Sequence, residues 1–179
     1  MKLPQNLLQQ MQRRGIVRTP RTWVGIVWGT WWGAGLTPYA PGTMGTLAGI
    51  PLAYAACDLT MGAKFALWLL ILVTGTWACG VVNTAMGTGD HQNLVVDEVL
   101  GMGITALTLT RESGWMWWAV AFGLFRLFDV VKPPPIRNFD RWSKNQAGNF
   151  WASGLGVMWD DALAGVYALA VLVALQRWL

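Results

Sequence analysis

The chain has 179 residues, of which 54% are hydrophobic and only 12% charged, about half the charged fraction of an average soluble domain. This composition indicates one integral membrane domain over 1–179 and argues against an ordinary soluble protein. The net charge of +4 does not indicate a nucleic-acid partner, because the basic residues flank apolar segments, as membrane insertion alone would produce.

The predicted elements begin after a basic N-terminal segment, 1–22, which lacks the pattern of a cleaved signal peptide. The next stretch, 23–36, is apolar but short and rich in glycine, so we expect an interfacial or re-entrant segment. Pro51 predicts a kinked or partly interfacial first span. The fold class is therefore all-α, a polytopic membrane bundle of about five spanning or near-spanning helices, at 45–57, 65–82, 94–110, 115–131 and 159–178.

The positively charged residues predict how these helices cross the bilayer. With the N-terminus in the cytoplasm and five spans, ten Lys and Arg residues fall on the cytoplasmic side and three on the other side. Such an excess is typical of cytoplasmic loops. The same topology brings four polar stretches to the cytoplasmic face, in addition to the N-terminal segment: 37–46, 89–98, 125–141 and 153–161.

Acidic residues within or against the apolar segments are the main candidates for chemistry, because burying an unpaired charge is costly. Helix N-termini favour acids, which could explain the adjacent pairs but not Asp129. An ion pair with Arg126 or Lys132, each three residues away, could explain Asp129. The sharper hypothesis is a shared Mg²⁺ site, since hard divalent cations prefer oxygen ligands. Its candidate catalytic and metal-binding residues are Asp97, Glu98, Asp129, Asp160 and Asp161.

Neighbouring acids on a helix point about 100° apart. We therefore expect one member of each adjacent pair to bind the metal, while the other orients a ligand, pairs with a cation or handles protons.

Three basic residues near these acids are suited to an anionic substrate. Arg offers a planar fork for phosphate oxygens and Lys a mobile charge, so Arg126, Lys132 and Arg137 are the candidate phosphate-binding residues. Pro133–Pro135 should end the preceding helix. The alternative for Lys132, Arg137 and Arg141 is an ordinary role as cytoplasmic anchors.

The stretch TPYAPGTMGT, residues 37–46, is a further candidate phosphate-binding element. Gly42 and Gly45 permit unusual backbone angles, and Thr43 could cap the following helix and leave N–H groups free for a phosphate. The alternative is a simple Pro-Gly turn.

The single histidine and the two cysteines contribute less. His91 is either a proton shuttle or a bystander, and Cys57 and Cys79 lie in apolar surroundings that do not suit a reactive thiolate. Carboxylates, Mg²⁺ and cations at a membrane face together indicate a phosphorylated lipid headgroup as substrate.

Four ordered blocks make the chain resemble the bacterial phosphatidylglycerophosphatase A family from about residue 33 to 165. They are GAGLTPYAPGTMGTLAGIP (33–51), VVDEVLGM (95–102), FRLFDVVKPPPIRNFDR (125–141) and GLGVMWDDALAG (154–165). The resemblance implies a multi-pass inner-membrane enzyme with a cytoplasmic site. It also implies Mg²⁺-dependent hydrolysis of phosphatidylglycerophosphate to phosphatidylglycerol and phosphate. The motif positions of the family correspond to Pro41, Gly42, Thr43, Gly45, Asp97, Glu98, Arg126, Asp129, Lys132, Arg137, Asp140, Asp160 and Asp161.

Several alternatives stay open at this point. The attacking group could be a metal-activated water or an Asp nucleophile. A small cation transporter would also place acids in the membrane, and a protein that only binds anionic lipids would carry basic clusters. The oligomeric state does not follow from the sequence.

Overall fold

The computed structural model describes residue 11 and residues 19–146 and 149–178, and within these ranges every regular element is helical. The predicted all-α fold is thus confirmed for this part of the chain. The elements are α2 (Pro20–Gly29), the 3₁₀ turn η1 (Ala34–Leu36), α3 (Pro41–Ala55), α4 (Met61–Met86), α5 (Val96–Thr105), the 3₁₀ turn η2 (Ala106–Thr108), α6 (Trp115–Val131), α7 (Ile136–Lys144) and α8 (Phe150–Trp178).

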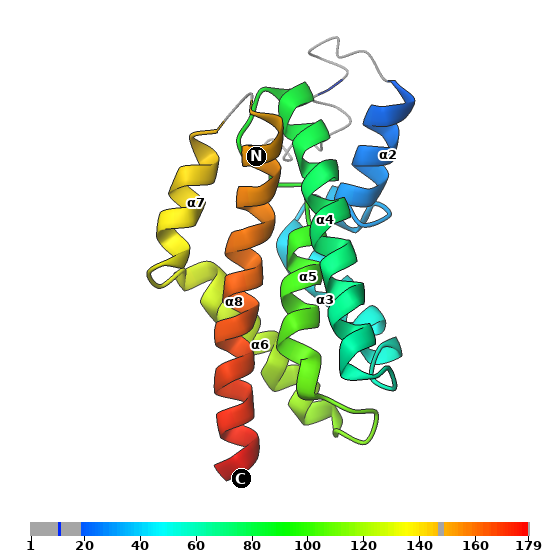
Figure 1. Ribbon diagram of the computed structural model, residues 1–179, viewed down its shortest axis with the longest axis vertical. Helices are drawn as coiled ribbons and strands as arrows, with labels where there is room; N and C mark the ends of the chain where they lie inside the picture. The colour runs from blue at the N-terminus through cyan, green and yellow to red at the C-terminus, as the bar shows by residue number, and fades with distance from the viewer. Residues whose placement is uncertain (1–10, 12–18, 147–148, 179) are drawn as a thin grey trace.

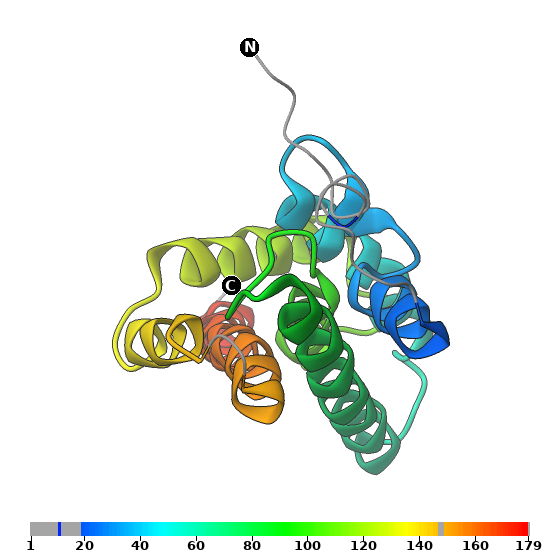
Figure 2. The same ribbon diagram turned by 90° about the horizontal axis from the view of Figure 1, so that it is seen from above.

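Helix α8 is the centre of the bundle, because it packs against α4, α5, α6 and α7. Helix α3 packs on α5, and α2 packs on α4. Figure 1 shows α4, α5 and α8 running roughly along the long axis of the molecule. Seen from above, α6, α7 and α8 lie to one side, α2 and α3 lie to the other, and α4 and α5 lie between them (Figure 2).

All five predicted apolar segments form helices, with boundaries of varying accuracy. The segment 115–131 matches α6 at both ends. The segment 159–178 is wrong at its start, because α8 begins nine residues earlier, at Phe150. The Asn149 side chain accepts a hydrogen bond from the Ala152 N–H (3.1 Å), a typical helix-capping contact. Asp160 and Asp161 therefore lie well inside a helix and not at its N-terminus.

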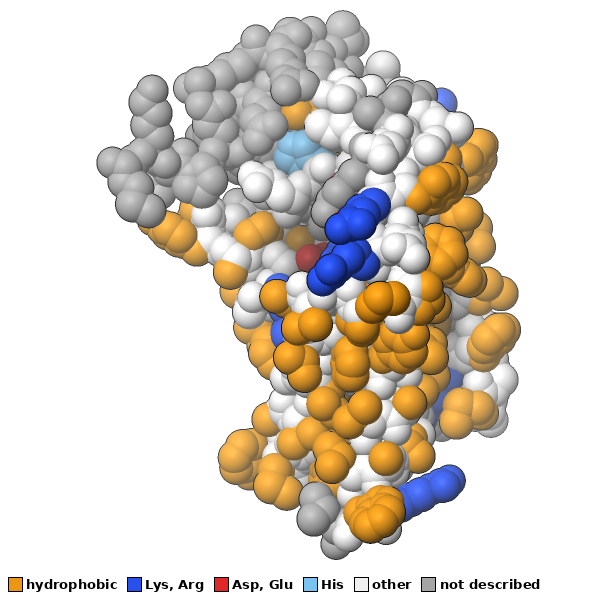
Figure 3. Space-filling model, turned by 90° about the vertical axis from the view of Figure 1, so that its left-hand side faces the viewer, with side chains coloured by type: hydrophobic (Ala, Val, Ile, Leu, Met, Phe, Trp, Pro, Cys, Tyr) orange, Lys and Arg blue, Asp and Glu red, His pale blue; other side chains and the backbone are white. Residues whose placement is uncertain are grey.

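Two helices in the described part of the chain, α4 with 26 residues and α8 with 29, are long and apolar enough to cross a membrane. Large apolar side chains are exposed on them, with Phe65 70% and Trp178 89% accessible. Figure 3 shows apolar side chains covering much of the lower part of one face. Helix α2 has 10 residues and is too short to span, as predicted for 23–36. The five-span topology and the cytoplasmic N-terminus stay predictions, and most of segment 1–22 lies outside the described residues.

A close contact between α5 and α8 positions the candidate site. A Cβ atom on Gly165 would lie 2.6 Å from the Gly101 carbonyl oxygen, closer than a real Cβ atom can approach. The absence of a side chain at Gly165 therefore lets the two backbones touch. Asp161, one helical turn before Gly165, is thereby placed beside the first turn of α5.

Candidate active site

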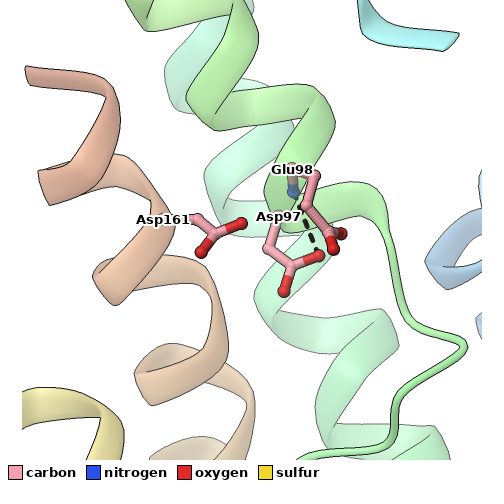
Figure 4. Close-up of side chains that lie close together, drawn as sticks. All are labelled: Asp97, Glu98 and Asp161. Carbon is pink, nitrogen blue, oxygen red and sulfur yellow. Dashed lines mark hydrogen bonds between the residues drawn. The ribbon is translucent and has the colours of Figure 1, made fainter. Parts of the chain in front are cut away.

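Three of the five predicted carboxylates form a cluster between α5 and α8. Asp97 and Glu98 lie in the first turn of α5, and Asp161 extends toward them from α8 (Figure 4). One carboxylate oxygen from each residue lies within 4.8 Å of the other two. Asp97 and Asp161 are buried, and the Glu98 N–H donates a hydrogen bond to Asp97 Oδ1 (3.1 Å). The cluster therefore concentrates negative charge at a buried point.

The cluster fits a hard divalent cation on the chemistry of its donor atoms. All three ligands are carboxylates, which Mg²⁺ prefers. Glu98 Oε2 is buried and has no hydrogen-bond partner among the described residues. An unpaired buried carboxylate oxygen is costly, and a cation bound between the three side chains would remove that cost.

The other predicted acids pair with cations around this cluster. In the last turns of α6, Arg126 Nη1 lies 2.5 Å from Asp129 Oδ2, so the predicted ion pair with Arg126 is confirmed. Lys132 makes no ion pair with Asp129. Its Nζ donates instead to Asp140 Oδ1 (2.6 Å) and Asp160 Oδ2 (2.5 Å). Lys132 therefore links α7 and α8 at the edge of the site.

The environment of Lys132 holds it in a defined and charged state. It caps the C-terminus of α6 with φ 45°, a left-handed conformation that is uncommon for residues other than glycine. Burial alone would lower the pKa of Lys132. The charges of Asp160 and Asp161 and the hydrogen bonds to Asp140 and Asp160 outweigh this effect, so the pKa is raised above its usual value. Lys132 is thus a permanent cation at this point.

The N-terminus of α3 closes the site from the opposite direction. A Cβ atom on Gly42 would lie 3.2 Å from Arg126 Nη1 and still closer to Glu98 Oε1. The predicted capping role of Thr43 is wrong, because the helix already begins at Pro41, after Ala40 with φ 46°. Proline is pre-organised for a first helical position. The N–H groups of Gly42 and Thr43 lie in the first turn, where no intrahelical acceptor is available. Gly45, in the next turn, lies against Val95.

Helix α7 was not expected from the sequence. It carries two residues of the predicted family motif, Arg137 and Asp140, and places them on different faces. Ile136 and Asp140, four residues apart, are both buried. That i, i+4 spacing is the signal that could have predicted a short packed helix. Arg137 is exposed and makes no ion pair within the described part of the chain. The structure therefore does not bring Arg137 into the carboxylate cluster.

The histidine and the cysteines are not members of the carboxylate cluster. His91 is buried in the connection between α4 and α5, and its Nδ1 accepts a hydrogen bond from the Asn93 N–H (3.3 Å). Cys57 and Cys79 are both buried. Neither thiol has the properties of a reactive nucleophile.

Comparison with known proteins supplies an independent line of information. The family model described as Phosphatidylglycerophosphatase A matches residues 27–176. Two relatives named phosphatidylglycerophosphatase A are each 40% identical. The one from Haemophilus influenzae aligns over 82% of this chain and 85% of its own length, and the one from Escherichia coli over 78% and 76%. A putative phosphatidylinositol-3-phosphatase of Bacteroides thetaiotaomicron is 36% identical over 86% of this chain and 93% of its own length. No solved structure shows a significant match.

Proposed function

Because the chain belongs to the phosphatidylglycerophosphatase A family and is a phosphatase, we propose that its substrate is phosphatidylglycerophosphate. The products would be phosphatidylglycerol and inorganic phosphate. One observation carries the proposal: three carboxylates, two cations and a helix N-terminus converge at one place in an otherwise apolar bundle. A phosphomonoester on a lipid is a ligand that needs all three.

We assign the carboxylates Asp97, Glu98 and Asp161 to a bound Mg²⁺. Their oxygens are close enough to share one ion, and the orphaned Glu98 Oε2 needs a positive partner. Mg²⁺ held there would act as a Lewis acid on the phosphate oxygens. Asp129 and Asp160 then serve to hold Arg126 and Lys132, with which they pair.

The two held cations bind the terminal phosphate in this proposal. Arg126 presents a planar fork and Lys132 a point charge with a third N–H still available beyond its two acid partners. The free N–H groups of the first turn of α3 add a further anion site. These groups are fixed before substrate arrives, so they stabilise the developing charge with little reorganisation.

The reaction in this geometry is the transfer of the terminal phosphoryl group to water. The oxygen of water forms a bond to phosphorus while the bond from phosphorus to the glycerol oxygen breaks. One water proton passes to the glycerol oxygen, and the phosphate leaves as the inorganic anion. Arg126 and Lys132 stay bound to the equatorial oxygens throughout and orient them for in-line attack.

The proposed setting is the bacterial inner membrane, with the site on its cytoplasmic side. The N-terminal ends of α3 and α5 meet the C-terminal end of α6 at the site. This arrangement supports helices of alternating direction, with α4 and α8 long enough to span the membrane and α3, α5 and α6 as the remaining spanning or near-spanning helices. The ten Lys and Arg residues of the predicted cytoplasmic side favour this orientation.

The proposal is tested by phosphate release from phosphatidylglycerophosphate in detergent micelles, with Mg²⁺ and with EDTA. We expect release only with Mg²⁺, and a loss of at least about 100-fold in Asp161→Asn, more than the loss of an outer partner of a metal site. Asp160→Asn should weaken substrate binding through Lys132 but leave Mg²⁺ affinity unchanged. Asp58→Asn is the control, because Asp58 pairs with Arg111 outside the site.

A second readout separates metal binding from catalysis. Mg²⁺ should raise the melting temperature of the wild type, since a ligand that binds only the folded state stabilises it, and should not raise that of Asp161→Asn. Folded wild type that releases no phosphate would overturn the assigned activity. Stabilisation by Mg²⁺ without phosphate release would favour the cation-transporter interpretation, and lipid binding that survives EDTA would favour the lipid-binding one.

A further inference from the structure

The four basic residues between 126 and 141 that the sequence analysis considered divide into an inner and an outer pair. The inner pair, Arg126 and Lys132, is held by the acids around the carboxylate cluster, which are Asp129, Asp140 and Asp160. The outer pair, Arg137 and Arg141, is exposed on α7 and makes no ion pair with any residue that the structure describes. The sequence resemblance placed Arg137 with the inner pair, and the structure does not.

Helix α7 carries the outer pair and also Asp140, which pairs with Lys132 at the site. Arg137 and Arg141 are four residues apart and share one face of α7. That face lies about 100° around the helix from Ile136 and Asp140, which are buried. Asp140 accepts a hydrogen bond from Lys132, so the helix that carries the outer pair also carries a partner of the inner pair. Figure 3 shows Lys and Arg side chains beside a hollow in which an acidic side chain is visible.

The outer pair has the properties of an anion site. Like charges four residues apart on a helix repel each other, and neither arginine makes a salt bridge with a residue that the structure describes. An anion bound between the two guanidinium groups would remove it and would gain charge-assisted hydrogen bonds. Phe139 and Trp142, exposed on the far flank of α7, leave the basic face open.

We propose that Arg137 and Arg141 bind the phosphodiester group of the lipid substrate while the inner site holds its terminal phosphomonoester. This inference rests on the proposed function, because phosphatidylglycerophosphate carries two phosphates joined by a glycerol. The monoester must reach the buried carboxylates, so the diester and the acyl chains stay outside, on the exposed side of Lys132. The outer pair thereby selects a headgroup with two phosphates.

The test compares ligands that carry one or both phosphates, using Arg137→Gln, Arg141→Gln and the double variant in a neutral detergent. For phosphatidylglycerophosphate, each single variant should raise KM about threefold and the double variant about tenfold, as expected for exposed ion pairs, with kcat within about twofold. Inhibition by phosphatidylglycerol, which has only the diester, should weaken by the same factor. Inhibition by inorganic phosphate, which probes the inner site, should stay unchanged.

Arg177→Gln is the matched control, since Arg177 is an exposed arginine at the end of α8 and should leave every constant unchanged. An unchanged KM in the double variant, or an equal rise in Arg177→Gln, would overturn the subsite. So would a parallel loss of inhibition by inorganic phosphate, because it would put the outer pair at the monoester. Wild type that releases no phosphate would instead refute the proposed function itself.

Discussion

Gly42 is the residue at which the smallest chemical change should have a large effect on activity. It lies in the first turn of α3, between Glu98 and Arg126. The Gly42→Ala substitution adds a single methyl group. That group would lie 3.2 Å from Arg126 Nη1 and closer still to Glu98 Oε1, so both side chains must move.

The size of the effect follows from which atoms move. The crowded atoms are the ends of flexible side chains, which can move aside. The substitution should therefore lower the free energy of unfolding by about 1 kcal/mol, the low end for overpacking. The same relaxation displaces a metal-ligand candidate and a phosphate-binding cation. Misplacement of reacting groups by about 1 Å costs about 100-fold in rate. We therefore expect kcat/KM to fall about 100-fold in a protein that stays folded.

The assay is phosphate release from phosphatidylglycerophosphate with Mg²⁺, beside thermal unfolding in the same detergent. Gly123→Ala is the control, because a Cβ atom at this position in α6 meets nothing within 4 Å. It should keep full activity and gain slightly in stability, as exposed helical glycines do on replacement by alanine. If Gly42→Ala keeps more than half of the wild-type activity, Glu98 and Arg126 do not work from the positions described.

Three further predictions test the surroundings of the site. Lys132→Met removes the cation that pairs with the buried Asp140 and Asp160 and should destabilise the fold by about 3 kcal/mol. Because the pKa of Lys132 is raised, its contribution is complete below its usual pKa of about 10.5 and is lost only as pH rises above the folded value. The difference in melting temperature should thus stay constant from about pH 8 to pH 9, and a difference that shrinks in that window contradicts the ion pairs. Gly165→Ala meets the fixed backbone of α5 and should cost about 2 kcal/mol in unfolding experiments, whereas Gly62→Ala, with open space around it, should cost nothing. In intact cells, an impermeant maleimide should label Glu112→Cys and not Asn138→Cys, and the opposite pattern would invert the proposed topology.

The sequence was most informative where local signals were sharp. Both ends of α6 could be predicted, since Gly114 precedes its apolar run and Pro133 to Pro135 follow it. The Arg126–Asp129 pair also followed from three-residue spacing on one helix. These features depend only on residues close together in the chain.

The features that sequence reasoning missed depend on tertiary packing. The stretch SGLG at 153–156 has low helix propensity, yet it is helical because Gly154 packs directly on the backbone of α4 at Thr76. Helix α7 forms from a polar stretch, with Ile136 and Asp140 buried. Its packing against α8 supplies the stability that a nine-residue helix lacks in isolation. Neither contact partner could be read from the local pattern.

Adjacent acids in this bundle contact different partners, and the charge balance of the site supports the proposed metal. Asp160 and Asp161 point in different directions, one to Lys132 and the other to the cluster, whereas Asp97 and Glu98 both reach the cluster. Six carboxylates thus surround the site, and the two inner cations offset only part of their negative charge. A phosphate dianion would be repelled from this arrangement at close range. The proposed divalent cation at the cluster would reverse the sign of the charge where the phosphate binds, and the outer arginines of α7 would supply positive charge along its approach.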